Sequence, residues 1–170
     1  MILWIVTSFG FYTLTFVVKY LGGDIFVNSY TSALAEVIAK LSAGGLILHT
    51  GLNRLFLVAF SLGTLGALLL CFNSEGSGTF VAISVFIAKF GFSQTWPANY
   101  ISILLIFPTV LNSTTMGICN ICARVCTMLA PLVVEIEPPY PMVIVTTGGL
   151  IAVVLSQFLK NTDTKTQTLK

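Results

Sequence analysis

Four ionisable side chains interrupt long apolar stretches of this sequence: Glu36, Lys40, Lys89 and Arg124. A charge at the centre of a lipid-spanning helix costs at least ~2.5 kcal/mol, so such residues normally face a bundle interior or water. Glu36 and Lys40 are spaced i, i+4 and share one helical face. They either form a local ion pair only, or also present the Lys40 ammonium to a solute. The four charges predict electrostatic binding of a small solute without covalent chemistry.

Arg124 lies on a narrow stripe of small and polar residues. At ~100° per residue, an arc of roughly 80° contains Ser113, Gly117, Asn120, Arg124, Thr127 and Pro131. Such a stripe suits helix packing or a water-filled pathway, but packing alone does not need an arginine. At ~1.5 Å per residue, Lys40 lies ~16 Å from the outer end of its span and Arg124 ~16 Å from the inner end of its own. Two cations at mid-membrane depth, with Glu36 nearby, predict an anion site.

Aromatic side chains within the apolar stretches are candidates to line the same pocket, namely Phe11, Tyr12, Trp96 and Tyr100. Aromatic faces suit flat organic solutes, although each ring has packing as its alternative role. Lys89 either snorkels to the outer interface or has a functional role.

Other reactive residues indicate no further chemistry. Cys119, Cys122 and Cys126 share one helix face nearly opposite Arg124, where we expect packing or lipid contact. The sequence has one histidine, His49, and no G-x-x-x-x-G-K-[ST] loop, so neither a zinc site nor ATP-driven chemistry is predicted. We expect no enzymatic activity, cofactor, metal or nucleic-acid partner.

The composition places these residues in a lipid bilayer. Only 8% of the 170 residues are charged and 56% are hydrophobic, whereas a soluble domain usually has about 25% charged residues. A spanning helix needs ~20 mostly apolar residues. Six stretches qualify: 2–20, 29–48, 54–72, 79–106, 113–134 and 141–159. The sequence predicts an all-α membrane protein with one six-helix bundle over residues 1–159 and a polar cytoplasmic tail over 160–170.

Basic residues predict the orientation. If the spans alternate, Arg54, Lys160, Lys165 and Lys170 share one side and Lys19 lies on the other, which predicts that both termini are cytoplasmic. An apolar stretch follows Met1 directly, without the basic region of a signal peptide. We therefore expect the chain to be the later part of a larger protein.

Several segments, in order, resemble the C-terminal half of the organic anion and cation transporter family of the major facilitator superfamily. TSFGFYTL and LGGDIFVN are similar to the seventh helix and its outer turn, and AEVIAKL to the eighth helix of the anion branch. AKFGFSQ and FPTVLNSTTMG resemble the tenth helix and its P-T turn. ARVCTMLAPLV resembles the eleventh helix, where the anion branch carries Arg and the cation branch commonly Asp.

The resemblance implies a secondary carrier of small organic solutes. The mid-span cations favour organic anions among them. By position, Lys40, Arg124 and Tyr12 match residues implicated in solute binding in the anion branch. Trp96 and Tyr100 match positions that are often aromatic, and Glu36 and Asn120 complete the candidate site. The family also implies alternating access, a plasma-membrane location, and a partner bundle that is either the missing N-terminal six helices or a second copy of the chain.

Two gate motifs depart from the family pattern. HTGLNR keeps only part of a G-R-R turn, and Leu105 and Asn112 replace the acid and the arginine of the acid-x-x-P-T-x-x-Arg signature. Losing both partners together avoids an unpaired buried charge. Two alternatives stay open: an organic cation or zwitterion carrier with Glu36 as counter-charge, and a truncated, non-transporting fragment that associates with full-length carriers.

Overall fold

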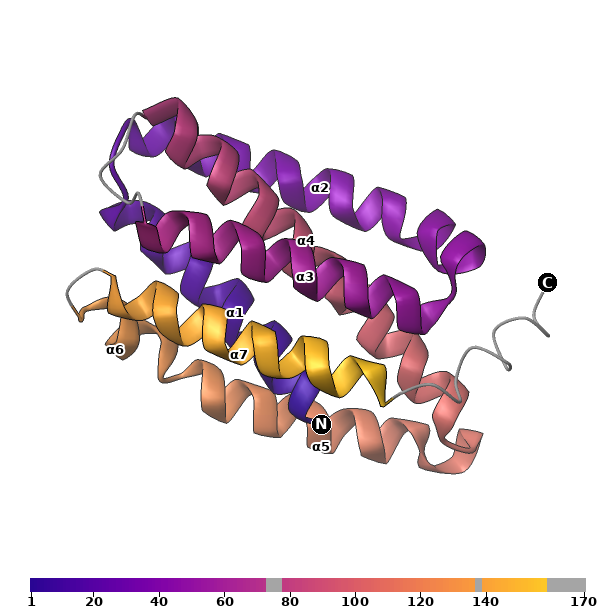
Figure 1. Ribbon diagram of the computed structural model, residues 1–170. Coiled ribbons are helices and arrows are strands. Elements are labelled where there is room, and N and C mark those ends of the chain that lie inside the picture. The colour runs from indigo at the N-terminus through magenta and orange to yellow at the C-terminus, as the bar shows by residue number, and fades with distance from the viewer. Residues whose placement is uncertain (73–77, 137–138, 159–170) are drawn as a thin grey trace.

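The computed structural model describes residues 1–72, 78–136 and 139–158, and these form helices without a strand. The long helices are α1 (Ile2–Val17), α2 (Ile25–Thr50), α3 (Leu52–Phe72), α4 (Gly78–Ile106), α5 (Thr109–Thr127) and α7 (Tyr140–Gln157). A 3-10 turn, η1 (Val18–Tyr20), extends α1, and the short α6 (Ala130–Val134) follows α5. Figure 1 shows these helices packed as one bundle. The predicted all-α fold is confirmed, while the predicted tail, 160–170, lies outside the described residues.

Local capping sets the ends of α2. The Asp24 side chain accepts a hydrogen bond from the Phe26 backbone N–H at 2.8 Å, so the helix begins before the apolar stretch that was predicted to start at residue 29. Gly51 ends the same helix with a φ of 83°, a conformation that favours glycine. Because α3 begins at Leu52, the turn between the two helices is very short.

The fifth predicted span, 113–134, lies within the candidate span Thr109–Val134, but its α-helix is not continuous. The chain leaves the α-helix at Met128 and Leu129 and resumes it at Ala130. Pro131 explains the break, because it has no N–H to donate to the Thr127 carbonyl and its ring crowds that carbonyl. Pro97 has no such effect, since α4 continues through it.

Helix α4 forms the centre of the bundle and contacts α1, α2, α3 and α5. Phe92, fully buried on α4, lies against glycines of three neighbouring helices: Gly10, Gly63 and Gly149. A Cβ atom at Gly10 would lie 2.6 Å from the Phe92 ring, and one at Gly63 would lie 2.9 Å from it. These glycines therefore allow the close approach of helices that is common in membrane bundles.

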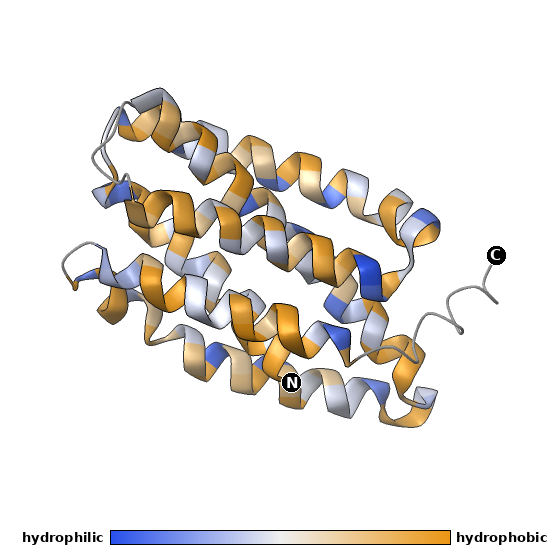
Figure 2. Ribbon diagram, in the orientation of Figure 1, coloured by the Kyte–Doolittle hydropathy of each residue, from blue (hydrophilic) through white to orange (hydrophobic). Residues whose placement is uncertain are grey.

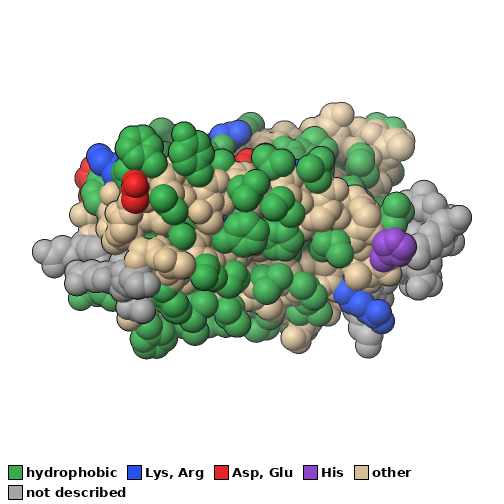
Figure 3. All heavy atoms as spheres, turned by 90° about the horizontal axis from the view of Figure 1, so that it is seen from above, with side chains coloured by type: hydrophobic (Ala, Val, Ile, Leu, Met, Phe, Trp, Pro, Cys, Tyr) green, Lys and Arg blue, Asp and Glu red, His purple; other side chains and the backbone are tan. Residues whose placement is uncertain are grey.

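Most of the long helices have the length and composition of membrane spans. Five segments of the described chain meet both criteria, namely Ile2–Tyr20, Ile25–Thr50, Leu52–Phe72, Thr109–Val134 and Tyr140–Gln157. The central α4 is not among them, and it buries polar residues such as Lys89, Gln94 and Asn99 inside the bundle. Hydrophobic residues run along the helices in Figure 2 and cover much of the face seen in Figure 3. A water-facing surface would be rich in charges, so this one suits lipid.

Candidate functional site

Arg124 and Tyr12, two residues of the predicted site, are in contact across the α1–α5 interface. The Arg124 Nη1 donates a hydrogen bond to the Tyr12 hydroxyl at 3.0 Å, and the guanidinium carbon lies 5.7 Å from the Tyr12 ring centroid. About one helical turn away, the hydroxyl oxygens of Ser8 and Thr127 are 2.9 Å apart. The two polar contacts hold α1 and α5 side by side and leave Arg124 exposed at the edge of the bundle.

Glu36 and Lys40 form the local ion pair that their spacing predicted. Lys40 Nζ and Glu36 Oε1 are 2.5 Å apart on α2, and the Lys40 side chain is 55% exposed. Lys40 contacts Glu36 on its own helix, whereas Arg124 contacts Tyr12 of α1. The structure therefore presents the two candidate cations separately, on α2 and on α5.

Lys89 points into the bundle, so the snorkelling alternative is wrong. The residue is 1% exposed, and its ammonium donates hydrogen bonds to the Thr15 Oγ1 at 2.5 Å and the Phe11 carbonyl at 3.3 Å. The same nitrogen lies 3.6 Å from the Phe11 ring centroid, within the range of a cation–π interaction. All three contacts are with α1, and the i, i+4 spacing of Phe11 and Thr15 is the signal in the sequence that places both on one face.

The four candidate aromatic residues form one continuous cluster with a fifth ring. Phe11 meets Tyr12 edge to face at 5.4 Å and Trp96 at 6.1 Å between centroids. Trp96 stacks on Tyr100 at 6.4 Å, and Tyr100 meets Trp4 at 4.8 Å. Sequence analysis did not include Trp4, although its position seven residues before Phe11 puts both on the same face of α1.

Asn120 lies on α5, one turn before Arg124, but its amide is engaged within its own helix. The Nδ2 donates to the Met116 carbonyl at 3.1 Å, and the side chain is half-buried. On another face of α5, Cys119 is buried in a small apolar cluster with Trp4 and Ile103, as expected for a packing role. Among the residues that the structure describes, no three His, Cys, Asp or Glu side chains gather as a metal site would require.

Two buried amides on α4 add polar contacts that sequence analysis did not identify. The Gln94 Nε2 donates to the Ser42 hydroxyl at 2.7 Å and so links α4 to α2. The Asn99 Nδ2 donates to the Thr7 hydroxyl at 2.9 Å and links α4 to α1. Polar contacts between helices of a membrane bundle stabilise a defined packing, because lipid offers no alternative partner.

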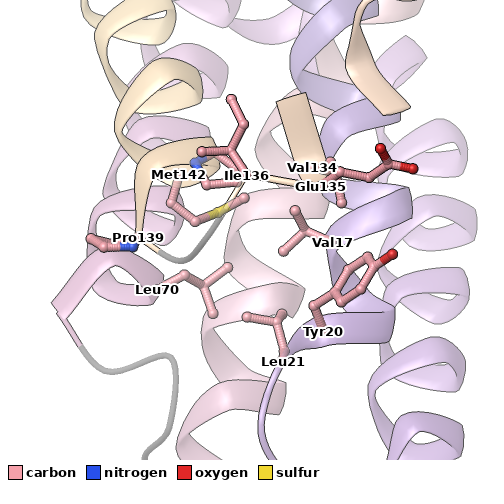
Figure 4. Close-up of a pocket in the computed structure, with 10 residues that line it drawn as sticks. Val17, Tyr20, Leu21, Leu70, Val134, Glu135, Ile136, Pro139 and Met142 are labelled. Atoms are coloured by element: carbon pink, nitrogen blue, oxygen red, sulfur yellow. The ribbon is translucent and has the colours of Figure 1, made fainter. Parts of the chain in front are cut away.

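A separate cavity lies near the η1 end of α1 (Figure 4). It holds about 200 Å³, and its lining consists of Val17, Tyr20, Leu21, Leu70, Val134, Glu135, Ile136, Pro139, Pro141 and Met142. Glu135 supplies a carboxylate at this mostly apolar wall. None of the candidate solute contacts lines the cavity, so it is distinct from the cluster around Tyr12 and Arg124.

No protein-family model matches the chain. Solute carrier family 22 member 4 of Mus musculus is 32% identical over 130 residues, which cover 76% of this chain and 23% of that protein. Organic anion transporter 3 of Rattus norvegicus is 30% identical over 164 residues, or 94% of this chain and 30% of its own length. Organic cation/carnitine transporter 2 of Homo sapiens is 26% identical over 162 residues, which cover 92% of this chain and 29% of that protein. The chain thus spans less than a third of the length of these relatives.

Proposed function

Because this chain is a homologue of the organic cation, carnitine and anion transporters of solute carrier family 22, we propose that it forms one six-helix bundle of a carrier for small organic solutes. Carriers with paired bundles alternate access by rocking one bundle against the other around a site near the bilayer midplane. The second bundle is the N-terminal six helices of a longer protein or a second copy of this chain. Both termini face the cytoplasm, and the membrane is the plasma membrane.

The favoured solute is an organic anion, and the exposed guanidinium of Arg124 carries this choice. Tyr12 takes one of its hydrogen bonds, and no salt bridge within the described ranges neutralises its charge. A guanidinium has five N–H donors, so several are available for a carboxylate or a similar anion. Charge-assisted hydrogen bonds of this kind are about twice as strong as neutral ones.

The other candidate residues have complementary roles in this proposal. Lys40 supplies a second cation, and Glu36 holds its side chain in place through the short ion pair. Tyr12, Trp96 and Tyr100 offer aromatic faces to the organic part of the solute. Asn120 adds an amide on the same helix as Arg124, with its carbonyl oxygen as an acceptor for a solute donor.

A carrier of organic cations or zwitterions is the second candidate. Its support is the Glu36 carboxylate, which is 30% exposed, together with the kinship to proteins named as cation and carnitine transporters. In that case Glu36 is the counter-charge for the solute and Lys40 is a local neutralising partner. The third candidate is a non-transporting fragment that associates with full-length carriers.

Uptake of dyes by cells expressing the chain tests these proposals. The anionic dye fluorescein and a cationic rhodamine should be compared for the unsubstituted chain, Lys40→Ala and Arg124→Ala. We expect both substitutions to reduce fluorescein uptake and leave rhodamine uptake unchanged. Unchanged fluorescein uptake in both variants excludes the anion site. If the chain alone takes up neither dye, but co-purifies with a co-expressed full-length relative and changes the dye uptake of that relative, the associating fragment is favoured.

A further inference from the structure

Lys89 is a buried cation whose charge is not neutralised by a carboxylate contact in the described chain. Its side chain is 1% exposed, and the salt bridge of the described residues joins Glu36 to Lys40 instead. Burying a charge is costly unless hydrogen bonds replace its hydration. The contacts that Lys89 makes with α1 must therefore be specific and strong.

Those contacts use the whole ammonium group. Two hydrogen bonds go to the Thr15 hydroxyl and the Phe11 carbonyl, and the nitrogen rests against the Phe11 ring at 3.6 Å. An ammonium has three donors, so this arrangement leaves little capacity for a further ligand. Lys40 on α2 differs, because its side chain is 55% exposed and its ammonium is accessible to a solute. The burial of Lys89 thus argues against direct contact with a solute.

The atoms that Lys89 holds on α1 are next to Tyr12. The Phe11 carbonyl belongs to the peptide unit that joins Phe11 to Tyr12, and the Thr15 hydroxyl donates to the same carbonyl at 2.8 Å. The Phe11 ring also packs edge to face on the Tyr12 ring. Since Tyr12 accepts the hydrogen bond from Arg124, an unbroken series of contacts runs from Lys89 on α4 to Arg124 on α5.

We propose that Lys89 is a positioning residue of the solute site: it fixes the turn of α1 that carries Tyr12 and thereby sets the contact between Tyr12 and Arg124. Lys89 touches no solute and acts through Phe11 and Tyr12. The part that concerns solute affinity rests on the proposed function, whereas the part that concerns the position of α1 does not. The two parts are tested separately.

Disulfide cross-linking tests the position of α1 without any solute. The four native cysteines are replaced by alanine in the full chain, and Ser8→Cys with Thr127→Cys then reports how α1 and α5 lie together, since these hydroxyls are 2.9 Å apart. Lys89→Met keeps the length of the side chain and removes the charge. We expect it to slow cross-linking by copper phenanthroline about tenfold, the effect of losing a hydrogen bond to a charged group.

Thr15→Val provides a second variant that keeps the buried lysine and removes the hydroxyl between it and the backbone. We expect it to slow cross-linking in the same direction as Lys89→Met but less strongly. Thr31→Val is the matched control, because the Thr31 hydroxyl makes the same type of bond, to the Val27 carbonyl, on α2. Abundance in the membrane and a single peak in size-exclusion chromatography show that each variant is folded.

Fluorescein uptake tests the effect on the solute site with a double-mutant cycle of Lys89→Met and Tyr12→Phe. If Lys89 acts through Tyr12, each substitution raises the half-saturating dye concentration. The double variant then has a half-saturating concentration no higher than that of the single variant with the larger effect. Additive effects, with unchanged cross-linking, show that Lys89 contacts the solute and overturn the proposal. Unchanged cross-linking and unchanged uptake also overturn it. Slowed cross-linking in a chain that takes up no fluorescein, either alone or with a co-expressed N-terminal six-helix bundle of a relative, supports the positioning of α1 and contradicts the proposed function instead.

Discussion

The Arg124 guanidinium and the Tyr12 hydroxyl meet at 3.0 Å, and this hydrogen bond joins the two helices that carry the strongest candidates for solute binding. The tyrosine restrains an arginine that would otherwise be free to move at the exposed edge of α5. Because Tyr12 is also packed against Phe11, the restraint extends to the aromatic cluster. The geometry of this pair is therefore the first property to test.

Tyr12→Phe removes the hydroxyl and keeps the ring. We expect the half-saturating concentration for fluorescein to rise about threefold to tenfold, because the hydrogen bond to Arg124 is lost but the exposed setting weakens its contribution. Dye uptake over a range of concentrations measures this effect. Tyr30→Phe is the control, since Tyr30 is 74% exposed on α2 and should leave uptake unchanged. Equal affinities of the Tyr12 variant and the unsubstituted chain contradict a positioning role for this hydroxyl.

Glu36→Gln separates the anion and cation interpretations. Removal of the carboxylate leaves Lys40 charged but no longer held in place, so fluorescein uptake should fall only in part and rhodamine uptake should not fall. Asp24→Asn removes the same charge outside the candidate site and keeps an effective helix cap, which makes it a matched control. A selective loss of rhodamine uptake in the Glu36 variant establishes the carboxylate as the counter-charge of a cation.

The fold was predictable because long apolar stretches have few alternatives in a membrane. Backbone groups that face lipid must be paired internally, so each stretch of sufficient length becomes a helix. The proline residues were harder to interpret. Helix α4 continues through Pro97, whereas the α-helix of the fifth span is interrupted just before Pro131. Whether a proline interrupts its helix depends on how neighbouring helices pair the freed backbone groups. The sequence of one segment does not reveal that pairing.

The candidate site was predictable where a contact is local. The spacing of Glu36 and Lys40 determines that they meet on one helix, and the structure confirms that ion pair. The contact of Lys89 with Phe11 and Thr15 depends instead on which face of α4 meets α1. That choice arises from packing around Phe92 and its glycine neighbours, so the direction of Lys89 could not be derived from its depth in the span.

Glycine substitutions test the packing of the bundle. Gly63→Ala places a methyl group 2.9 Å from the Phe92 ring, and we expect a loss of roughly 1–3 kcal/mol in the free energy of unfolding. Gly117→Ala is the control, for which we expect the free energy of unfolding to change in the opposite direction. A Cβ atom there meets nothing within 4 Å, so alanine should stabilise the helix by up to about 1 kcal/mol. Melting temperatures of the purified protein in detergent measure both effects, and a stabilising Gly63 variant contradicts the close packing around Phe92.

Pro131→Ala tests the cause of the break between α5 and α6. Alanine supplies an N–H for the Thr127 carbonyl and removes the ring that crowds it, so we expect a continuous helix through Met128 and Leu129. Amide hydrogen exchange followed by mass spectrometry should become slower in a peptide that contains these residues. Pro97→Ala is the comparison, because α4 is already continuous and its exchange pattern should change little. If exchange around Met128 is the same with and without Pro131, packing of α6 on α1 causes the break, and the proline merely accommodates it.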